Sequence, residues 1–212
     1  MISDMGGISY QYSAANPEPS HQHLYPSVSR FLKNVPPGAV VMDAGCGNGT
    51  FISLFQDRNW KLYGSDLSPT GIEVARRTFP NINFFLADGQ TLYADFLATV
   101  GPVDVVLSTE VIEHIYDPRG FLRNCYDLLK PGGTVILTTP YHGYLKNVAI
   151  SVLGKWDHHH TVFWDGGHIK FWSRATLSKL LEDEGFEIIG FHGCGRAPYL
   201  WESMILVGRK KA

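Results

Sequence analysis

The stretch VVMDAGCGNGTF, residues 40–51, sets a short apolar run directly before three glycines that alternate with other residues. The apolar run is typical of a buried strand, and Phe51, Leu54 and Phe55 then recur at helical spacing. A glycine-rich loop between a strand and a helix lets the backbone approach a ligand closely and presents amide donors at the helix start. The stretch therefore predicts a ligand-binding loop that opens an α/β fold.

The position of the aspartate separates this loop from a dinucleotide site. The dinucleotide fingerprint Gly-x-Gly-x-x-Gly seats a pyrophosphate on the helix N-terminus. Here Asp43 precedes Gly45, Gly47 and Gly49 with regular one-residue gaps. A carboxylate within reach of the loop would repel a pyrophosphate and would suit a ligand that carries an ammonium group. A plain nucleotide-binding or dehydrogenase domain, whose glycines only serve tight turns, is the alternative.

Strand-like and helix-like segments alternate after the loop. A helix is predicted over 69–79, with Ser68 as its N-cap and Pro69 at its first position. The alternation implies parallel strands joined by right-handed crossover helices, and the last two strands, which no helix separates, are expected to pair antiparallel. We predict an α/β, Rossmann-like, doubly wound sheet of seven mostly parallel strands with an antiparallel last strand and helices on both faces. The strands after the first are expected at 61–67, 82–88, 103–109, 134–140, 186–191 and 203–210.

Length, charge and cysteine content limit the class of protein. A chain of 212 residues, 44% hydrophobic and 18% charged, is expected to form one domain over 1–212, with an N-terminal arm and cover helix at 1–36. The net charge of −2 gives no sign of a nucleic-acid partner, and no apolar stretch reaches the length of a membrane span. Three widely spaced cysteines and the lack of a secretory pattern favour a cytoplasmic setting. Monomer and homodimer are both compatible with the sequence.

Two further acidic residues end the second and third predicted strands. Asp66 is placed to accept hydrogen bonds from both hydroxyls of a ribose. Asp88, in the sequence Ala-Asp-Gly, is placed to meet the exocyclic amine of an adenine. Each could individually be a turn residue at a strand end. Their joint spacing instead favours an adenosine-containing ligand.

These motifs resemble those of class I S-adenosylmethionine-dependent methyltransferases, closely over about residues 39–140 and in outline over the remainder. By that resemblance, Asp43 and the glycine loop hold the methionine part of the cofactor, Asp66 the ribose and Asp88 the adenine. The segments VDVVLSTEVIEHI and LLKPGGTVILTTP match the family as well. The residues expected to bind S-adenosylmethionine are Asp43, Gly45, Cys46, Gly47, Gly49, Asp66, Leu67, Asp88, Gly89 and Glu110.

The segment STEVIEHIYDP, residues 108–118, carries candidates for chemistry at the acceptor. Glu110, Glu113 and His114 would share one face of a helical turn, where two carboxylates and an imidazole could bind a divalent cation. This Glu-x-x-Glu-His pattern resembles that of ubiquinone-biosynthesis O-methyltransferases. It is also similar to a metal-binding motif in small-RNA 2'-O-methyltransferases, which implies Mg²⁺ or a similar hard cation. In the alternative without a metal, Glu110 shapes the cofactor pocket, and His114 is a general base facing the acceptor or a generic pocket or core histidine.

Residues 141–172, between the fifth strand and the next helix, are expected to build the acceptor pocket, as this stretch commonly does in the family. The stretch is rich in aromatic side chains, which favour a hydrophobic acceptor, and residues 145–153 predict an amphipathic helix that could act as a lid. The alternative is that the aromatics only pack the segment against the sheet. His168 could point inward as a base or a fourth metal ligand, whereas the run 158–160 of three histidines is interpreted as part of a loop.

The sequence thus predicts an enzyme that transfers a methyl group from S-adenosylmethionine to a small-molecule acceptor. A hydroxyl oxygen of an aromatic or hydrophobic metabolite is the favoured target, with His114 and His168 as catalytic candidates. N- or C-methylation of a metabolite, RNA 2'-O-methylation and cofactor binding without catalysis, as in a sensor, are the alternatives. RNA is disfavoured because the chain has no basic patch, and a sensor would need no second pocket.

Overall fold

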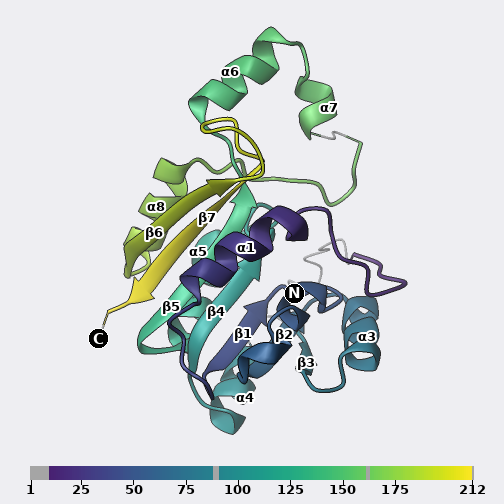
Figure 1. The fold of residues 1–212 in the computed structure, drawn as a ribbon, viewed down its shortest axis with the longest axis vertical. Coiled ribbons are helices and arrows are strands. Elements are labelled where there is room, and N and C mark those ends of the chain that lie inside the picture. Colours follow the sequence, from purple (N-terminus) through teal and green to yellow (C-terminus); the bar gives the residue numbers. More distant parts are fainter. Residues whose placement is uncertain (1–9, 88–90, 161–162, 212) are drawn as a thin grey trace, which may run out of the picture.

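A seven-stranded sheet with the order β3-β2-β1-β4-β5-β7-β6 lies at the centre of the molecule (Figure 1). The computed structural model describes residues 10–87, 91–160 and 163–211. Strands β1 to β5 run parallel, and β7 pairs antiparallel with both β5 and β6, which confirms the predicted fold class. The strands are β1 (Val40–Ala44), β2 (Lys61–Asp66), β3 (Asn83–Leu86), β4 (Val103–Thr109), β5 (Leu129–Pro140), β6 (Phe186–Cys194) and β7 (Ser203–Lys210).

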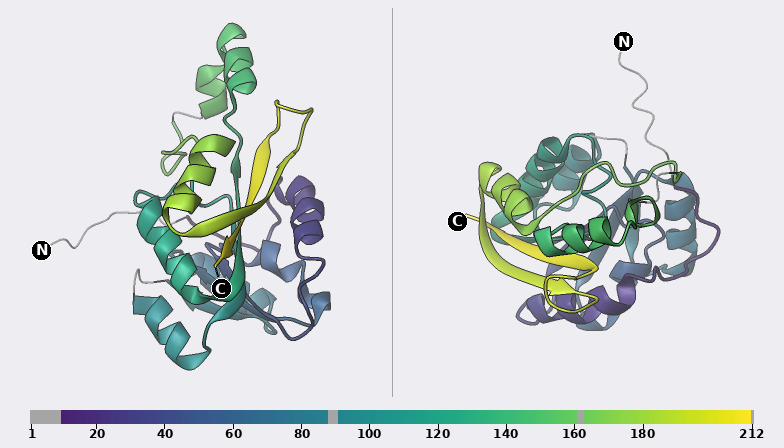
Figure 2. Two further views of the ribbon diagram at one scale, coloured as in Figure 1. Left: turned by 90° about the vertical axis from the view of Figure 1, so that its left-hand side faces the viewer. Right: turned by 90° about the horizontal axis from the view of Figure 1, so that it is seen from above.

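Helices cover both faces of the sheet (Figure 2). Successive side chains of β1 point to opposite faces, so that Val41 packs in one hydrophobic core and Met42 in the other. The first core is covered by α1 (His21–Phe31), α2 (Thr50–Ser53) and α3 (Pro69–Thr78), with the short 3₁₀ turn η1 (Gln56–Arg58) after α2. The second is covered by α4 (Thr91–Thr99), α5 (Pro118–Leu128) and α8 (Arg174–Asp183).

The helices that flank the site begin at side chains that satisfy their first backbone donors. The hydroxyl of Ser68 accepts from Gly71 N at 3.0 Å, as its predicted N-cap role requires. Asp117 likewise accepts from Gly120 N at 3.0 Å at the start of α5. Pro69 and Pro118 occupy the first turn of their helices, where the missing N–H costs nothing. These caps set where α3 and α5 begin after β2 and β4.

Three elements differ from the expectation. Helix α4 was not predicted, although its apolar residues recur at helical spacing and pack in the second core. Strand β5 begins at Leu129 rather than near residue 134, because Leu129 already pairs with Val103 of β4. The histidine run that was expected to lie in a loop forms part of the short helix α7 (Trp156–His160). The rings of Trp156 and His160 are one helical turn apart, and their centroids are separated by 4.6 Å.

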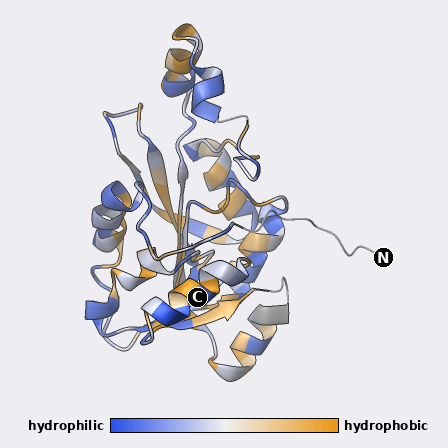
Figure 3. Ribbon diagram, turned by 90° about the vertical axis from the view of Figure 1, so that its right-hand side faces the viewer, coloured by the Kyte–Doolittle hydropathy of each residue, from blue (hydrophilic) through white to orange (hydrophobic). Residues whose placement is uncertain are grey.

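Helix α6 (Tyr144–Val152) confirms the helix predicted after β5, and with α7 it projects beyond the carboxyl end of that strand (Figure 1). Hydrophobic residues appear on the projecting helices in Figure 3, and Tyr144 and Val152 are each 80% exposed. Within the described residues, no helix combines the length and the hydropathy needed to cross a membrane.

Candidate active site

The glycine loop is held in a conformation that only glycine adopts easily. Gly45, Gly47 and Gly49 have φ angles of 87°, 52° and 76°, in the left-handed region. A Cβ on Gly45 would lie 2.5 Å from the Val111 side chain, so this position is also crowded. The amides of Gly45 and Cys46 donate to the carbonyl of Ser65 at 2.8 and 2.9 Å, which ties the loop to the end of β2. The thiol of Cys46 is buried in this tight turn.

Asp43 supplies a buried carboxyl group beneath the loop. Its side chain is 1% exposed, and neither oxygen has a hydrogen-bond partner among the described residues. Burial, and then the nearby Asp66 carboxylate, raise the pKa of Asp43 to about 8. An unpartnered buried carboxyl group is unfavourable unless a donor is supplied. A ligand ammonium group would supply both a donor and the opposite charge, so Asp43 fits the ligand that the sequence predicts.

Asp66 joins the loop to the start of α3. Its Oδ2 accepts from Gly47 N and its Oδ1 from Ser68 N, both at 2.8 Å. Each oxygen keeps a further lone pair for ligand hydroxyls, because a carboxylate oxygen can accept two hydrogen bonds. Leu67, beside it, is 59% exposed. Asp88 and Gly89, expected at the adenine, lie outside the described residues, so the ribose side alone can be compared with the prediction.

The N-terminal arm crosses the loop at the carboxyl ends of the strands. Tyr12 N donates to Thr70 Oγ1 at 3.0 Å, and Ser68 Oγ donates to the carbonyl of Tyr10. The side-chain nitrogen Nδ2 of Asn48 donates to the backbone carbonyls of Ala14 and Asn16 at 3.2 and 3.0 Å. The ring of Tyr12 lies so close to Gly47 that a Cβ there would meet its hydroxyl at 2.6 Å. The arm therefore covers the loop that is expected to hold the cofactor.

Glu110 lies where β4 ends. It has a φ of 53°, which is uncommon for a residue with a side chain. Its Oε1 accepts from Thr138 Oγ1 at 2.8 Å and its Oε2 from Ser203 Oγ at 3.4 Å. Burial raises the pKa of Glu110 to about 7, against the opposing effect of these two hydroxyl donors. Its carboxyl group is thus engaged by β5 and β7.

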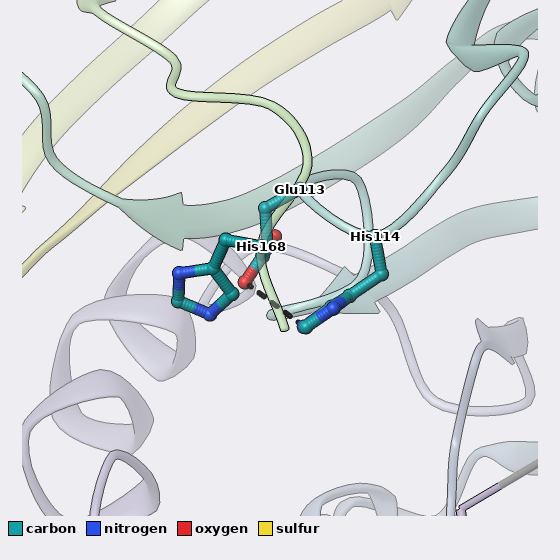
Figure 4. Close-up of side chains that lie close together, drawn as sticks. All are labelled: Glu113, His114 and His168. Carbon is teal, nitrogen blue, oxygen red and sulfur yellow. Dashed lines mark ion pairs between the residues drawn. The ribbon is translucent and has the colours of Figure 1, made fainter. Parts of the chain in front are cut away.

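Glu113, His114 and His168 form the cluster that could hold a cation (Figure 4). One potential ligand atom of each lies within 4.8 Å of those of the others, and His114 Nε2 is 4.0 Å from Glu113 Oε1. The predicted ligands were Glu110, Glu113 and His114, with His168 as a possible fourth; the structure brings His168 into the cluster and leaves Glu110 out of it. The difference arises because residues 111–114 form a tight turn and not a helix. His168 is brought in by the amides of Ile169 and Lys170, which donate to the Glu113 carbonyl at 2.9 and 3.0 Å.

The hydrogen bonds of His114 fix which ring nitrogen carries the proton. Nδ1 lies 2.9 Å from the Gly166 carbonyl and 3.3 Å from that of Gly167. Because carbonyl oxygens only accept, Nδ1 must be the donor, and Nε2 keeps its lone pair. The Tyr10 hydroxyl donates to Gly166 O at 2.6 Å and lies 3.0 Å from Nδ1, from which it can accept. Burial lowers the pKa of His114, which keeps its imidazole neutral at neutral pH.

The donor set of this cluster indicates which cation would fit. Glu113 is 1% exposed and its carboxyl oxygens have no hydrogen-bond partner in the described part of the chain. Burial lowers the pKa of His168 to about 4, so its imidazole is a neutral ligand as well. Two imidazoles and one carboxylate suit Mn²⁺, Fe²⁺ or Zn²⁺, whereas Mg²⁺ favours oxygen ligands. The expectation of Mg²⁺ therefore has no support from these three side chains.

The aromatic residues of 141–172 divide into three groups. Trp164 contacts the site: its ring centroid lies 5.7 Å from that of His114 and 5.8 Å from that of His168. Trp172 instead packs inward and donates to the Ile112 carbonyl at 3.2 Å. Phe163 and Tyr144 are 98% and 80% exposed. The segment thus contributes some aromatic surface to the site, while other rings pack against the protein or face solvent.

Comparison with known proteins agrees with this geometry. A family model described as a methyltransferase domain matches residues 20–190. A probable S-adenosylmethionine-dependent methyltransferase from Mycolicibacterium smegmatis is 29% identical over 164 residues, covering 76% of this chain and 58% of that protein. A ubiquinone biosynthesis O-methyltransferase from Dinoroseobacter shibae is 31% identical over 171 residues, covering 77% of this chain and 67% of that protein. The structure of magnesium protoporphyrin IX methyltransferase from Synechocystis, with bound SAH, has a TM-score of 0.66 at 22% identity and covers 91% of this chain and 84% of its own.

These matches define the family and the fold. The chain spans less than two thirds of the length of the Mycolicibacterium relative. The family model nevertheless covers most of this chain, and the Synechocystis structure shares its sheet and flanking helices. S-adenosylmethionine is the cofactor that this family implies, and the unpartnered Asp43 carboxyl group fits its ammonium group. The chain belongs to the methyltransferase-domain family, within the class I S-adenosylmethionine-dependent methyltransferases.

Proposed function

We propose that this chain transfers a methyl group from S-adenosylmethionine to a hydroxyl oxygen of a small aromatic or hydrophobic acceptor. The observation that carries the proposal is the orientation of His114, whose Nδ1 is held by backbone carbonyls while Nε2 lies 4.0 Å from Glu113 Oε1. A neutral amine acceptor needs no base, whereas a hydroxyl must lose its proton as it is methylated. A positioned neutral imidazole therefore favours oxygen over nitrogen.

In this proposal, the loop and the arm hold the cofactor and shield it. Asp43 accepts hydrogen bonds from the ammonium group, and the remaining lone pairs of Asp66 accept those of the ribose hydroxyls. When bound, S-adenosylmethionine supplies a methyl carbon activated by the sulfonium, with a neutral thioether as leaving group. Tyr12, which lies against Gly47, excludes water from the same side of the loop.

His114 then takes the acceptor's proton at Nε2. With S-adenosylmethionine bound, the O–C bond would form as the S–C bond breaks, and the proton would move from the acceptor hydroxyl to the imidazole. The resulting imidazolium is stabilised by the Gly166 carbonyl at Nδ1. Alignment of the acceptor oxygen with the methyl carbon, and not covalent chemistry by the protein, supplies most of the rate.

A divalent cation bound by Glu113, His114 and His168 is a second way to activate the hydroxyl. Such an ion would lower the pKa of the acceptor hydroxyl in place of a base. Turnover measured after exhaustive chelation distinguishes the two modes. If the cation acts, activity is lost and is restored by Mn²⁺ better than by Mg²⁺. Unchanged turnover after chelation would leave His114 as the base.

The proposal is tested with S-adenosylmethionine carrying a labelled methyl group and a panel of phenols, catechols, anilines and short RNAs. We expect label on the oxygen of an aromatic hydroxyl, identified by mass spectrometry. Transfer only to anilines would support the N-methyltransferase alternative, and transfer only to RNA the 2'-O-methyltransferase alternative. Calorimetric binding of the cofactor without transfer to any acceptor class would favour a sensor.

A further inference from the structure

A second group of ionisable side chains lies between the end of β5 and the projecting helices. It consists of His142 after β5, Lys146 on α6, and His159 and His160 on α7. The ring centroid of His142 lies 5.7 Å from those of both His159 and His160. All four side chains carry nitrogen donors, and none carries a carboxylate. We call this group the basic cluster.

In the described part of the chain, two ring nitrogens of the basic cluster are buried without partners, and its ammonium group has one weak partner. His142 is 7% exposed, and its Nε2 has no hydrogen-bond partner among the described residues. The same holds for His160 Nε2. Lys146 is 6% exposed, and its ammonium group makes one long hydrogen bond, to the Glu202 carbonyl at 3.4 Å. Buried donors without acceptors are unfavourable, and a buried ammonium without a counter-ion is more so.

The pKa shifts in the basic cluster also indicate that acidic groups do not fully compensate its positive charge. Burial, and then repulsion from Arg196, lower the pKa of Lys146 to about 8, although Glu202 and Glu110 oppose this shift. The Glu202 carboxylate is itself paired with Arg196 at 2.7 Å. Burial, and then the charge of Lys146, lower the pKa of His142 to about 3. Within the described residues, no carboxylate forms an ion pair with Lys146.

We propose that the basic cluster binds an anionic group, a carboxylate or a phosphate, carried on the apolar body of the acceptor, an inference that rests on the proposed function. Such a group would accept from the Lys146 ammonium and from imidazole N–H groups, and would neutralise the buried charge. A metal ion does not fit the cluster, because the Lys146 ammonium would repel it. The apolar body has aromatic partners at hand: Phe171, whose ring lies 4.9 Å from that of His160, and Trp156, at 4.6 Å.

The basic cluster is continuous with the candidate catalytic histidine. The ring of His168 lies 4.9 Å from that of His114. Phe171, three residues further along the chain, has its ring 5.1 Å from that of His142 and 4.9 Å from that of His160. An acceptor held at the cluster by its anionic end would therefore extend toward His114 Nε2, where its hydroxyl would react.

The test is direct binding, measured by titration calorimetry on the full chain without S-adenosylmethionine. The probes are 2-naphthoate, 2-naphthyl phosphate and the neutral 2-naphthamide, which share one aromatic body. We expect at least one anionic probe to bind roughly tenfold or more tightly than the amide, the size of a charge-assisted hydrogen bond. The relative affinities of naphthoate and naphthyl phosphate identify the preferred anion. Equal affinity for all three probes would overturn the inference. This outcome is measured on the wild-type chain, so it does not depend on whether a variant folds.

Two substitutions locate the binding. Lys146→Met nearly keeps the volume of the side chain, and His142→Phe replaces the imidazole with a somewhat larger apolar ring. Each removes the donor, and both should abolish the preference for the anionic probe. Lys155→Met, on an exposed lysine between α6 and α7, is the matched control and should keep it. A preference that survives in folded Lys146→Met and His142→Phe would place the anion elsewhere and contradict the proposal. Because no methyl transfer is measured, failure of the proposed function would leave this result unaffected.

Discussion

The cofactor side and the acceptor side of this molecule are built in different ways. The glycine loop, Asp43 and Asp66 come from one stretch of chain, 40–66, and are held by the ends of adjacent strands in the sheet. The acceptor side draws its candidates from the turn after β4 and the segment 141–172, where Phe163 is 98% exposed, and the N-terminal arm contacts both sides. In the proposed function, a loop held by the sheet thus binds the cofactor, while a segment outside the sheet contacts the acceptor.

This contrast predicts that substitutions on the two sides change different quantities. The largest effect is expected for His114→Asn on the acceptor side. Loss of the proton acceptor should lower kcat on the order of 10²-fold or more, with affinity for S-adenosylmethionine unchanged. Turnover with the best acceptor of the panel and calorimetry with the cofactor measure the two quantities. His158→Asn, on an exposed histidine, is the control. A variant that loses cofactor affinity and keeps its kcat would show that His114 serves cofactor binding and not the acceptor.

On the cofactor side, Asp66→Ala should weaken S-adenosylmethionine binding roughly ten- to hundredfold, which corresponds to the loss of charge-assisted hydrogen bonds to the ribose. Its backbone bonds to Gly47 N and Ser68 N are lost as well, so part of the effect comes from the loop itself. Asp57→Ala, on the exposed side of η1, should leave the affinity as it is. Calorimetry that finds unchanged affinity in Asp66→Ala would remove the ribose assignment.

Asp43 gives a prediction that depends on pH and is measured as a change in stability. The pKa of Asp43 is raised from an ordinary value of 3.8 to about 8, so between these values the folded state binds more protons than the unfolded state. The free energy of unfolding contributed by this group must therefore fall as pH rises from about 4 to about 8. Other buried groups contribute slopes of their own, so the measurement is the difference between wild type and Asp43→Asn.

We expect thermal unfolding of the cofactor-free protein to show Asp43→Asn gaining stability relative to wild type across that range. S-adenosylmethionine should reduce the gain, because its ammonium group favours the ionised carboxylate of the wild type. Parallel pH profiles of the two proteins would mean that Asp43 is not protonated in the folded state. The experiment sharpens the comparison between the two sides, because it tests the buried carboxyl group without any acceptor.

The same contrast explains what could be predicted from the sequence. Asp43, Gly45, Gly47 and Gly49 lie in one local motif whose spacing and backbone angles are set within a few residues, so the loop was predictable. The parallel pairing of β1 to β5 followed from the alternation of strands and helices, whereas the order of the strands in the sheet came from the structure. By contrast, the approach of His168 to Glu113 depends on backbone bonds across more than fifty residues, so the sequence could suggest His168 as a fourth ligand but could not show that Glu110 lies outside the cluster. The aromatic content of 141–172 did not reveal which rings would face inward.

Local periodicity was also missed in one place and misleading in another. Tyr93, Phe96 and Leu97 recur at helical spacing and could have revealed α4, which packs on the second core. The i, i+3, i+4 spacing of Glu110, Glu113 and His114 suggested a shared helical face. The chain instead forms a turn, and Glu110, with its positive φ, directs its carboxyl group to Thr138 and Ser203. Spacing predicts a shared face only when the helix is present.

The smallest effect is expected where the two sides meet, at Tyr10. Its backbone carbonyl accepts from Ser68 beside the loop, and its hydroxyl bonds Gly166 O and lies 3.0 Å from His114 Nδ1. Burial, followed by the charges of Glu113 and Asp66, raises the pKa of Tyr10 to about 12, so the hydroxyl stays a donor at neutral pH. Tyr10→Phe removes only the hydroxyl and should cost about 1 kcal/mol in the free energy of unfolding.

Because Gly166 and Gly167 still hold His114 Nδ1, kcat of Tyr10→Phe should fall only a few-fold, and cofactor affinity should not change. Urea unfolding, kcat and calorimetry measure the three quantities, with Tyr116→Phe, on a tyrosine that is 79% exposed, as the control. If Tyr10→Phe instead lost cofactor affinity while kcat stayed constant, the hydroxyl would act on the cofactor side alone. We would then assign the N-terminal arm to the cofactor side, and the acceptor side would begin at His114.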